Sequence, residues 1–128
     1  MDFKMSEHDH HYPRTLRLVR SADFDRVYRQ RATASDGLLL VFADRNGLSH
    51  PRLGLSVSRK VGGAVVRNRW KRRLREAFRL NRSNLPPGVD LIVIPRTTNG
   101  PSRAGEPPFE LLTQSLVRLA ARAAKKLV

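Results

Sequence analysis

Residues 59–79 read RKVGGAVVRNRWKRRLREAFR and join a dense positive charge to a helical pattern. Between Arg67 and Arg82 there are eight Lys or Arg side chains and one acid, Glu76. Charge runs of this kind are usually solvated tails, but here apolar residues recur every three or four positions and therefore share one face of a helix. That apolar face consists of Val66, Trp70, Leu74, Ala77 and Phe78. The stretch predicts a helix that packs on a core and exposes a cationic surface.

The opposite face of this helix carries charge of almost one sign. It consists of Asn68, Lys71, Arg72, Arg75 and Arg79. Like charges one helical turn apart repel each other by about 0.2–0.5 kcal/mol per pair, and a fold tolerates this more readily where a polyanion binds. A face that serves only solubility is the alternative, but solubility does not require a single sign of charge.

The charge of the whole chain supports the same reading. Of its 128 residues, 25 are Lys or Arg and 11 are Asp or Glu, which gives a formal net charge of +14. This excess predicts a polyanionic partner, either a nucleic acid or an anionic membrane surface. The length and a hydrophobic fraction of 40% predict one folded domain with a modest core.

Several classes of protein are excluded or disfavoured by composition. The chain has no cysteine, which excludes disulfides, thiolate catalysis and Cys-based zinc sites. No window approaches 18 uncharged apolar residues, so we expect no membrane-spanning helix. No apolar signal-peptide core follows the N-terminus. We therefore expect a cytoplasmic protein without a membrane partner.

The N-terminal residues 1–12 are polar and contain His8, His10 and His11. They read either as a metal-binding tract or as a disordered tail. We favour the tail, because a flexible segment offers no neighbouring groups to orient the imidazole rings. Residues 13–128 are then the single folded domain.

Periodicity predicts the other elements. They are, in order, a helix at 21–31, strands at 38–43 and 52–58, the basic helix, a strand at 89–94 and a helix from Phe109 to Leu127. Ser21 is expected as the N-cap of the first helix, with Asp23 in its first turn. Residues 33–37 read as a turn region, and there is room for one more strand around 45–49. One small sheet with helices packed on it is an α+β or α/β sandwich.

Two features of this sandwich have both a structural and a functional reading. The strand at 52–58 has one face made of Gly54, Ser56 and Ser58. This small face either lets a ligand approach the backbone closely or packs against the first helix. Phe24 and Tyr28 on the first helix are one turn apart, and their spacing alone is equally compatible with ordinary core packing.

The sequence favours binding over catalysis by side chains. It has no nucleophile elbow, zinc-protease motif, phosphate-binding loop or dinucleotide fingerprint. Its few acids are scattered, unlike the paired carboxylates that hold catalytic metals. No recognition-helix pair or basic zipper indicates DNA. Arginine-rich helices suit the phosphates and shape of structured RNA.

The stretches around the basic helix resemble one family. Residues 52–60 read RLGLSVSRK, and residues 64–79 read AVVRNRWKRRLREAFR. In this context the tripeptide Arg67-Asn68-Arg69 is specific for the bacterial ribonuclease P protein family. Further matches are Tyr12-Pro13-Arg14, Asp23-Phe24 and Gly88-Val89-Asp90. The similarity covers about residues 12–120.

The resemblance implies a fold in finer detail. It implies an α+β helix-sheet sandwich similar to the second domain of ribosomal protein S5. It also implies a left-handed βαβ crossover through the basic helix, whereas chirality alone predicts a right-handed one. Gly63 and Trp70 depart from the residues common in the family, which are an asparagine and an aliphatic residue.

The resemblance also implies a function. The protein is expected to bind the catalytic RNA of ribonuclease P and precursor tRNA, and to assist removal of the 5′ leader. Catalysis and Mg²⁺ are expected on the RNA, with no catalytic or metal-binding side chain in the protein. The residues that match the catalytic-RNA surface are Arg59, Lys60, Arg67, Asn68, Arg69, Lys71, Arg72 and Arg75. Those that match a separate leader cleft are Phe24, Tyr28 and Ser56.

Two other functions are compatible with the basic helix. One is a ribosome-associated structural RNA-binding protein without a role in cleavage. The other is an autonomous nuclease, which the lack of paired carboxylates disfavours.

Overall fold

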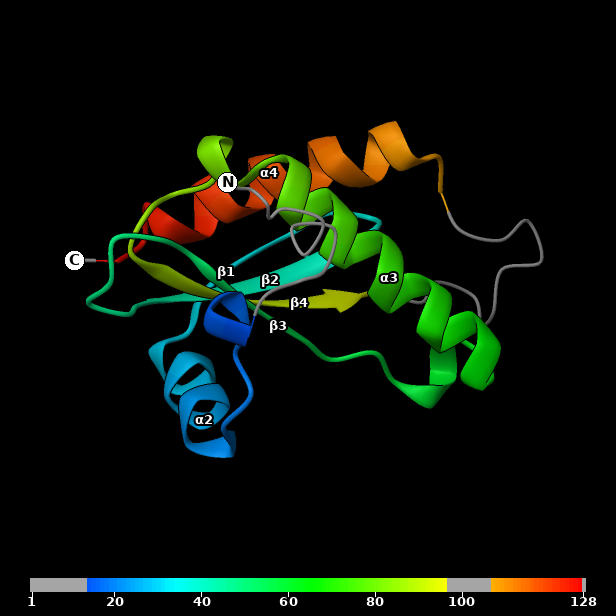
Figure 1. Cartoon of the computed structure of the whole chain (residues 1–128), viewed down its shortest axis with the longest axis horizontal. Coiled ribbons are helices and arrows are strands. Elements are labelled where there is room, and N and C mark those ends of the chain that lie inside the picture. The colour runs from blue at the N-terminus through cyan, green and yellow to red at the C-terminus, as the bar shows by residue number, and fades with distance from the viewer. Residues whose placement is uncertain (1–13, 97–106, 128) are drawn as a thin grey trace, which may run out of the picture.

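The computed structural model describes residues 14–96 and 107–127 (Figure 1). The predicted tail at 1–12 and the surface loop that the sequence predicts at 97–106 therefore lie outside the described residues. The helices are α2 (Ser21–Gln30), α3 (Ala64–Leu80) and α4 (Phe109–Ala124), and the short 3-10 turns are η1 (Arg14–Leu16), η2 (Arg59–Val61) and η3 (Arg82–Asn84). The strands are β1 (Ala32–Ser35), β2 (Leu39–Arg45), β3 (Arg52–Leu55) and β4 (Val89–Pro95).

The strands form one mixed sheet in the order β1-β2-β4-β3. β2 pairs antiparallel with both β1 and β4, whereas β3 pairs parallel with β4. A parallel pair needs a crossover connection, and α3 supplies it between β3 and β4. The α+β class and the βαβ unit through the basic helix are confirmed. The left hand of that unit stays a prediction from the resemblance.

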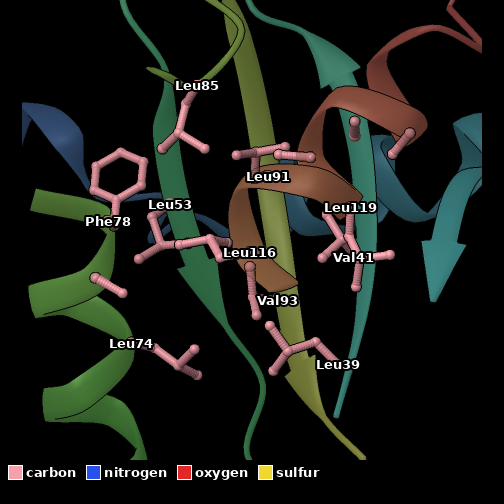
Figure 2. Close-up of a cluster of buried hydrophobic side chains, with 14 of the residues drawn as sticks. Leu39, Val41, Leu53, Leu74, Phe78, Leu85, Leu91, Val93, Leu116 and Leu119 are labelled. Carbon is pink, nitrogen blue, oxygen red and sulfur yellow. The ribbon is translucent and has the colours of Figure 1, made fainter. Parts of the chain in front are cut away.

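The helices cover the two faces of the sheet unequally. α3 and α4 pack on one face, and the short α2 packs on the other (Figure 1). Alternate residues of each strand point to opposite faces, so each strand contributes to both layers. Figure 2 shows the larger core, in which strand residues lie against α3 and α4: Leu39, Val41, Leu53, Leu91, Val93, Leu74, Phe78, Leu116 and Leu119.

The apolar stripe of the basic helix is confirmed. Trp70, Leu74, Ala77 and Phe78 of α3 are buried, and Val66 is partly buried against the same core. Full burial of a Leu or Phe side chain stabilises a fold by about 1.5–3 kcal/mol, so this stripe fixes which face of α3 points outward. Gly62 precedes the helix at φ 151°, and a Cβ there would lie 2.9 Å from the Cβ of Val66. The turn into α3 therefore requires glycine at that position.

One strand prediction was wrong. β1 lies at 32–35, where the sequence reads as a turn region, and residues 46–51 form no strand. β1 exists because its residues pair with β2 from Ala32↔Ala43 to Ser35↔Leu40. The turn between them is closed by Asp36, whose carboxylate accepts the N–H groups of Leu38 and Leu39 at 2.8 and 2.9 Å.

The predicted N-cap of the first helix was also wrong. Ser21 lies inside α2, and Arg20 is the N-cap, with no side-chain capping bond. The carbonyl of Arg20 instead accepts the N–H groups of Asp23 and Phe24. The helix ends at Arg31, which adopts the left-handed conformation at φ 59°. Two other elements are shorter than predicted. β3 ends at Leu55 and not at residue 58, and α4 ends at Ala124 and not at Leu127.

Candidate nucleic-acid interface

Three aromatic rings gather on the face of the sheet that α2 partly covers. The rings of Phe24 and Tyr28 have centroids 6.3 Å apart, and Tyr28 meets Phe42 of β2 edge-on at 4.9 Å. All three rings are half-buried, and they rest on the fully or nearly buried side chains of Val27, Leu18 and Ile92. Phe42 is absent from the residues predicted for this surface. Its alternation with Val41 and Ala43, which lie in the core, is the signal that places it here.

The small face of β3 is occupied by the first helix at one position. A Cβ on Gly54 would lie 2.7 Å from Cζ of Phe24 and 3.1 Å from Cβ of Leu18. Gly54 therefore lets the Phe24 ring lie against the strand, which supports the packing reading at this residue. Ser56 follows β3 on the same face and is half-buried, and its N–H donates to the carbonyl of Val93 at 3.1 Å.

A cavity of about 180 Å³ opens at the edge of β3, where α2 and α3 approach the same strand. Its apolar lining includes Phe24, Leu53 and Leu55. Its cationic lining consists of Arg17 and of Lys71 and Arg75 of α3. Arg17 forms an isolated parallel β-bridge with Leu53. The cavity therefore combines an aromatic ring with positive charges from two parts of the chain.

The eight predicted contacts to a catalytic RNA lie together on η2 and α3, but in two settings. Five are exposed: Arg59, Lys60, Asn68, Arg69 and Arg72. Arg67, Lys71 and Arg75 are half-buried, and the last two line the cavity beside Phe24. Lys71 and Arg75 thus do not point straight away from the apolar stripe. The basic surface and the aromatic cluster meet at the edge of β3.

A network of charged side chains lies beside the aromatic cluster. Asp90 of β4 is fully buried and accepts hydrogen bonds from Arg26, from Asn46 at 3.0 Å and from Arg52 through two bonds of 2.8 Å. Arg26 also donates to Asp44 of β2 at 2.5 Å. Burial by itself raises the pKa of Asp90, but the hydrogen bonds from Arg52, Asn46 and Arg26 outweigh it, so the pKa lies below its ordinary value.

Residues 14–96 and 107–127 contain neither a metal-binding cluster of side chains nor a membrane-spanning helix. Within these ranges no group of three or more His, Asp or Glu side chains is arranged to hold a metal ion. No helix within them is long and apolar enough to cross a membrane.

A small α+β domain with a cationic helix beside half-exposed aromatic rings is typical of the class of proteins that bind RNA and single-stranded nucleic acid. The family model described as Ribonuclease P matches residues 12–124. The chain belongs to the ribonuclease P protein family. It is thus an RNA-binding protein of tRNA processing and a protein component of an endoribonuclease.

Individual relatives agree with this assignment. The ribonuclease P protein component of Oleidesulfovibrio alaskensis is 42% identical over 108 residues, 83% of this chain and 84% of the relative. That of Caldanaerobacter subterraneus is 38% identical over 103 residues, 80% of this chain and 84% of the relative.

Solved structures of the family share the fold. The RNase P protein of Thermotoga maritima, solved in complex with 1-(4-fluorophenyl)-2-thiourea, has a TM-score of 0.71 at 34% identity and covers 83% of this chain and 98% of its own. The RNase P protein of Staphylococcus aureus has a TM-score of 0.69 at 33% identity and covers 86% of this chain and 95% of its own.

Proposed function

We propose that this protein binds the catalytic RNA of ribonuclease P through η2 and α3, and the 5′ leader of precursor tRNA through the aromatic cluster and the adjoining cavity. In this way it assists removal of the leader in the cytoplasm. The observation that carries the proposal is the cavity at the edge of β3, where Phe24 meets Lys71 and Arg75. A single-stranded nucleic acid needs both components, because its bases stack on rings and its phosphates need cations.

The leader surface extends from the cavity across the sheet. Phe24, Tyr28 and Phe42 supply half-exposed rings, each able to contribute about 1–3 kcal/mol where a base stacks. Ser56 lies on the same face and has a hydroxyl group suited to a phosphate or sugar oxygen. Lys71 and Arg75 contact the leader backbone where it leaves the rings.

The catalytic-RNA surface is the outward side of η2 and α3. Arg59, Lys60, Asn68, Arg69 and Arg72 are exposed there, and Arg67 lies beside them. Arginine forks bind phosphates bidentately and stack on bases, which suits a folded RNA read by its backbone and shape. Lys71 and Arg75 lie at the boundary between the two surfaces, and we propose that they contact both RNAs.

The bond-breaking chemistry belongs to the RNA in this proposal, with Mg²⁺ held there. Asp44 of β2 and Asp90 of β4 are both engaged by Arg26, so they are poorly suited to coordinate a metal. The side chains of the protein bind and orient the two RNAs, and we assign no proton transfer to them.

Reconstitution with the cognate catalytic RNA at low Mg²⁺ tests the proposal. Leader removal from precursor tRNA is expected to be faster with the protein than without it. Cleavage by the purified protein without RNA would contradict the proposal and indicate a nuclease. Copurification with ribosomal RNA in place of one long catalytic RNA would contradict it in favour of a ribosome-associated role.

A further inference from the structure

The helix α2 is attached to the sheet by two adjacent stripes. The apolar stripe consists of Phe24, Val27 and Tyr28, of which only Val27 is fully buried. The polar stripe contains Arg26 and Gln30, one turn apart. Because only Val27 of this stripe is fully buried, the apolar contacts alone restrain rotation of the helix about its axis less than a wider buried stripe would. The polar stripe has contacts that restrict such a rotation.

Arg26 contacts two strands at once. Its Nη1 donates to Asp44 of β2 at 2.5 Å and to the carbonyl of Arg45 at 2.9 Å, and its Nη2 donates to Asp90 of β4. Asp44 and Asp90 are directly paired across the two strands. Gln30 donates to the other oxygen of Asp44 at 2.9 Å. A planar guanidinium that bridges two neighbouring carboxylates fixes a direction as well as a distance.

The carboxylates are themselves held in place. Arg52 binds both oxygens of Asp90 at 2.8 Å, and Asn46 binds one of them at 3.0 Å. Asp90 is fully buried, so its orientation depends on these partners. The groups that Arg26 contacts therefore belong to a rigid part of the sheet.

We propose that Arg26 is a positioning residue for leader recognition: its bridge from Asp44 to Asp90 sets the rotation of α2 and hence the places of the Phe24 and Tyr28 rings. This inference rests on the proposed function. A helix with its side chains has a radius of about 5–6 Å, so a rotation of about 20° moves a ring by about 2 Å. Recognition sites need their groups held to within about 0.5 Å, which is why the bridge matters for binding.

The test compares Arg26→Met with Arg29→Met in the holoenzyme reconstituted with catalytic RNA. Arg29 is an exposed residue of the same helix, so its variant loses the same charge without losing the bridge. The measurement is the ratio of the Kd values for mature tRNA and for precursor tRNA. Arg26→Met is expected to reduce this preference for the precursor about tenfold, the order of one lost base stack. Arg29→Met is expected to keep the full preference for the precursor. The affinity for mature tRNA is expected to stay unchanged in both variants.

A second comparison distinguishes the positioning role of Arg26 from a role in stability alone. Asp36→Asn perturbs the contact between the β1–β2 turn and α4, away from α2. If this variant reduces the preference as much as Arg26→Met at an equal loss of Tm, the positioning role is overturned. Where Arg26→Met does not fold, Asp44→Asn removes the charge and one acceptor from one arm of the bridge and keeps the Asp90–Arg52 pair, and a loss of preference in the same direction is expected.

Phe24→Ala, measured in parallel, separates the inference from the proposed function. If Phe24→Ala keeps the full preference for precursor tRNA, the proposed function fails. If Phe24→Ala loses the preference and both Arg26→Met and Asp44→Asn keep it, only the positioning role of Arg26 is overturned.

Discussion

Gly54 and the ring of Phe24 share one small space between β3 and α2. A methyl group at position 54 would lie 2.7 Å from Cζ of Phe24, closer than such atoms approach each other, so the ring would have to move. We expect Gly54→Ala to destabilise the fold by about 1–3 kcal/mol through overpacking. We also expect it to weaken precursor tRNA binding relative to mature tRNA.

Urea unfolding and the two Kd values measure these effects. Gly37→Ala is the matched control, because a Cβ at Gly37 meets nothing within 4 Å. Equal stabilities of the two variants would show that Phe24 has room to move and that Gly54 is not required.

Arg31 is a non-glycine residue with a strained backbone. It ends α2 in the left-handed conformation, at φ 59°, where a Cβ is unfavourable by about 1–2 kcal/mol. Glycine adopts this conformation freely but has more freedom to lose on folding. We expect Arg31→Gly to raise the free energy of unfolding by about 0.5–1 kcal/mol. Arg29→Gly inside the helix is the control, with an expected loss of about 1 kcal/mol; a loss in both variants would contradict the strain at Arg31.

At the level of elements, Asp36 joins the β1–β2 turn to α4. Its carboxylate accepts hydrogen bonds from Ser115 and Arg118 of α4, each at 2.6 Å, and from two N–H groups of its own turn. Burial raises the pKa of Asp36, but the bonds from Ser115, the two backbone N–H groups and Arg118 outweigh it, so its pKa in the fold lies below the ordinary value.

This lowered pKa has a definite sign in stability. The unfolded chain has an Asp pKa of about 3.9, so the charged carboxylate stabilises the fold above about pH 4, and this contribution is lost as the pH falls through the lowered value. We expect the free energy of unfolding to fall as the pH is lowered below about 4, with a shallower fall in Asp36→Asn. Urea unfolding over this range measures it, and equal slopes in both proteins would exclude Asp36 as a contributor.

The elements differ in how far the sequence alone predicts them. α3 is predictable because its stripe from Trp70 to Phe78 and its charge are local patterns. β1 is not, because Ala32–Ser35 has weak strand character and becomes a strand only through pairing with β2. The bridge of Arg26 to Asp44 and Asp90 cannot be predicted from the sequence for the same reason. The strand register that places Asp44 beside Asp90 joins distant parts of the chain.

The candidate site shows a similar limit. The helical pattern predicts the cationic face of α3, whereas Phe24 and Tyr28 become candidate site residues only through the family resemblance, because their spacing is equally compatible with core packing. It does not show that Lys71 and Arg75 lie beside Phe24, since periodicity gives the face of a helix but not its position along the sheet.

At the scale of the whole molecule, cations are found on more than one side. Arg72 is exposed on α3, and Arg122 is exposed in the last turn of α4. Binding to a phosphate backbone releases counterions, so log Kd depends linearly on log salt, with about 0.7–0.9 in slope per phosphate contact. We expect Arg72→Ala to lower the slope for the catalytic RNA by about that amount and Arg122→Ala to leave it unchanged.

Titrations of the catalytic RNA at several salt concentrations measure both slopes. Because the two variants lose the same charge, a general effect of net charge would change both slopes equally. That result would remove the special role of α3.

The double use of α3, with core residues on one side and RNA-facing residues on the other, constrains how the gene can change in length. One codon inserted after Arg72 turns every later residue of the helix by about 100°. Leu74 and Phe78, now fully buried, would leave their places in the core, and Arg73 would take the place of Leu74. The same insertion at Gly47, in an exposed turn, only lengthens a loop. Insertions and deletions compatible with a working enzyme are therefore expected in turns such as 46–49 and absent from 64–80.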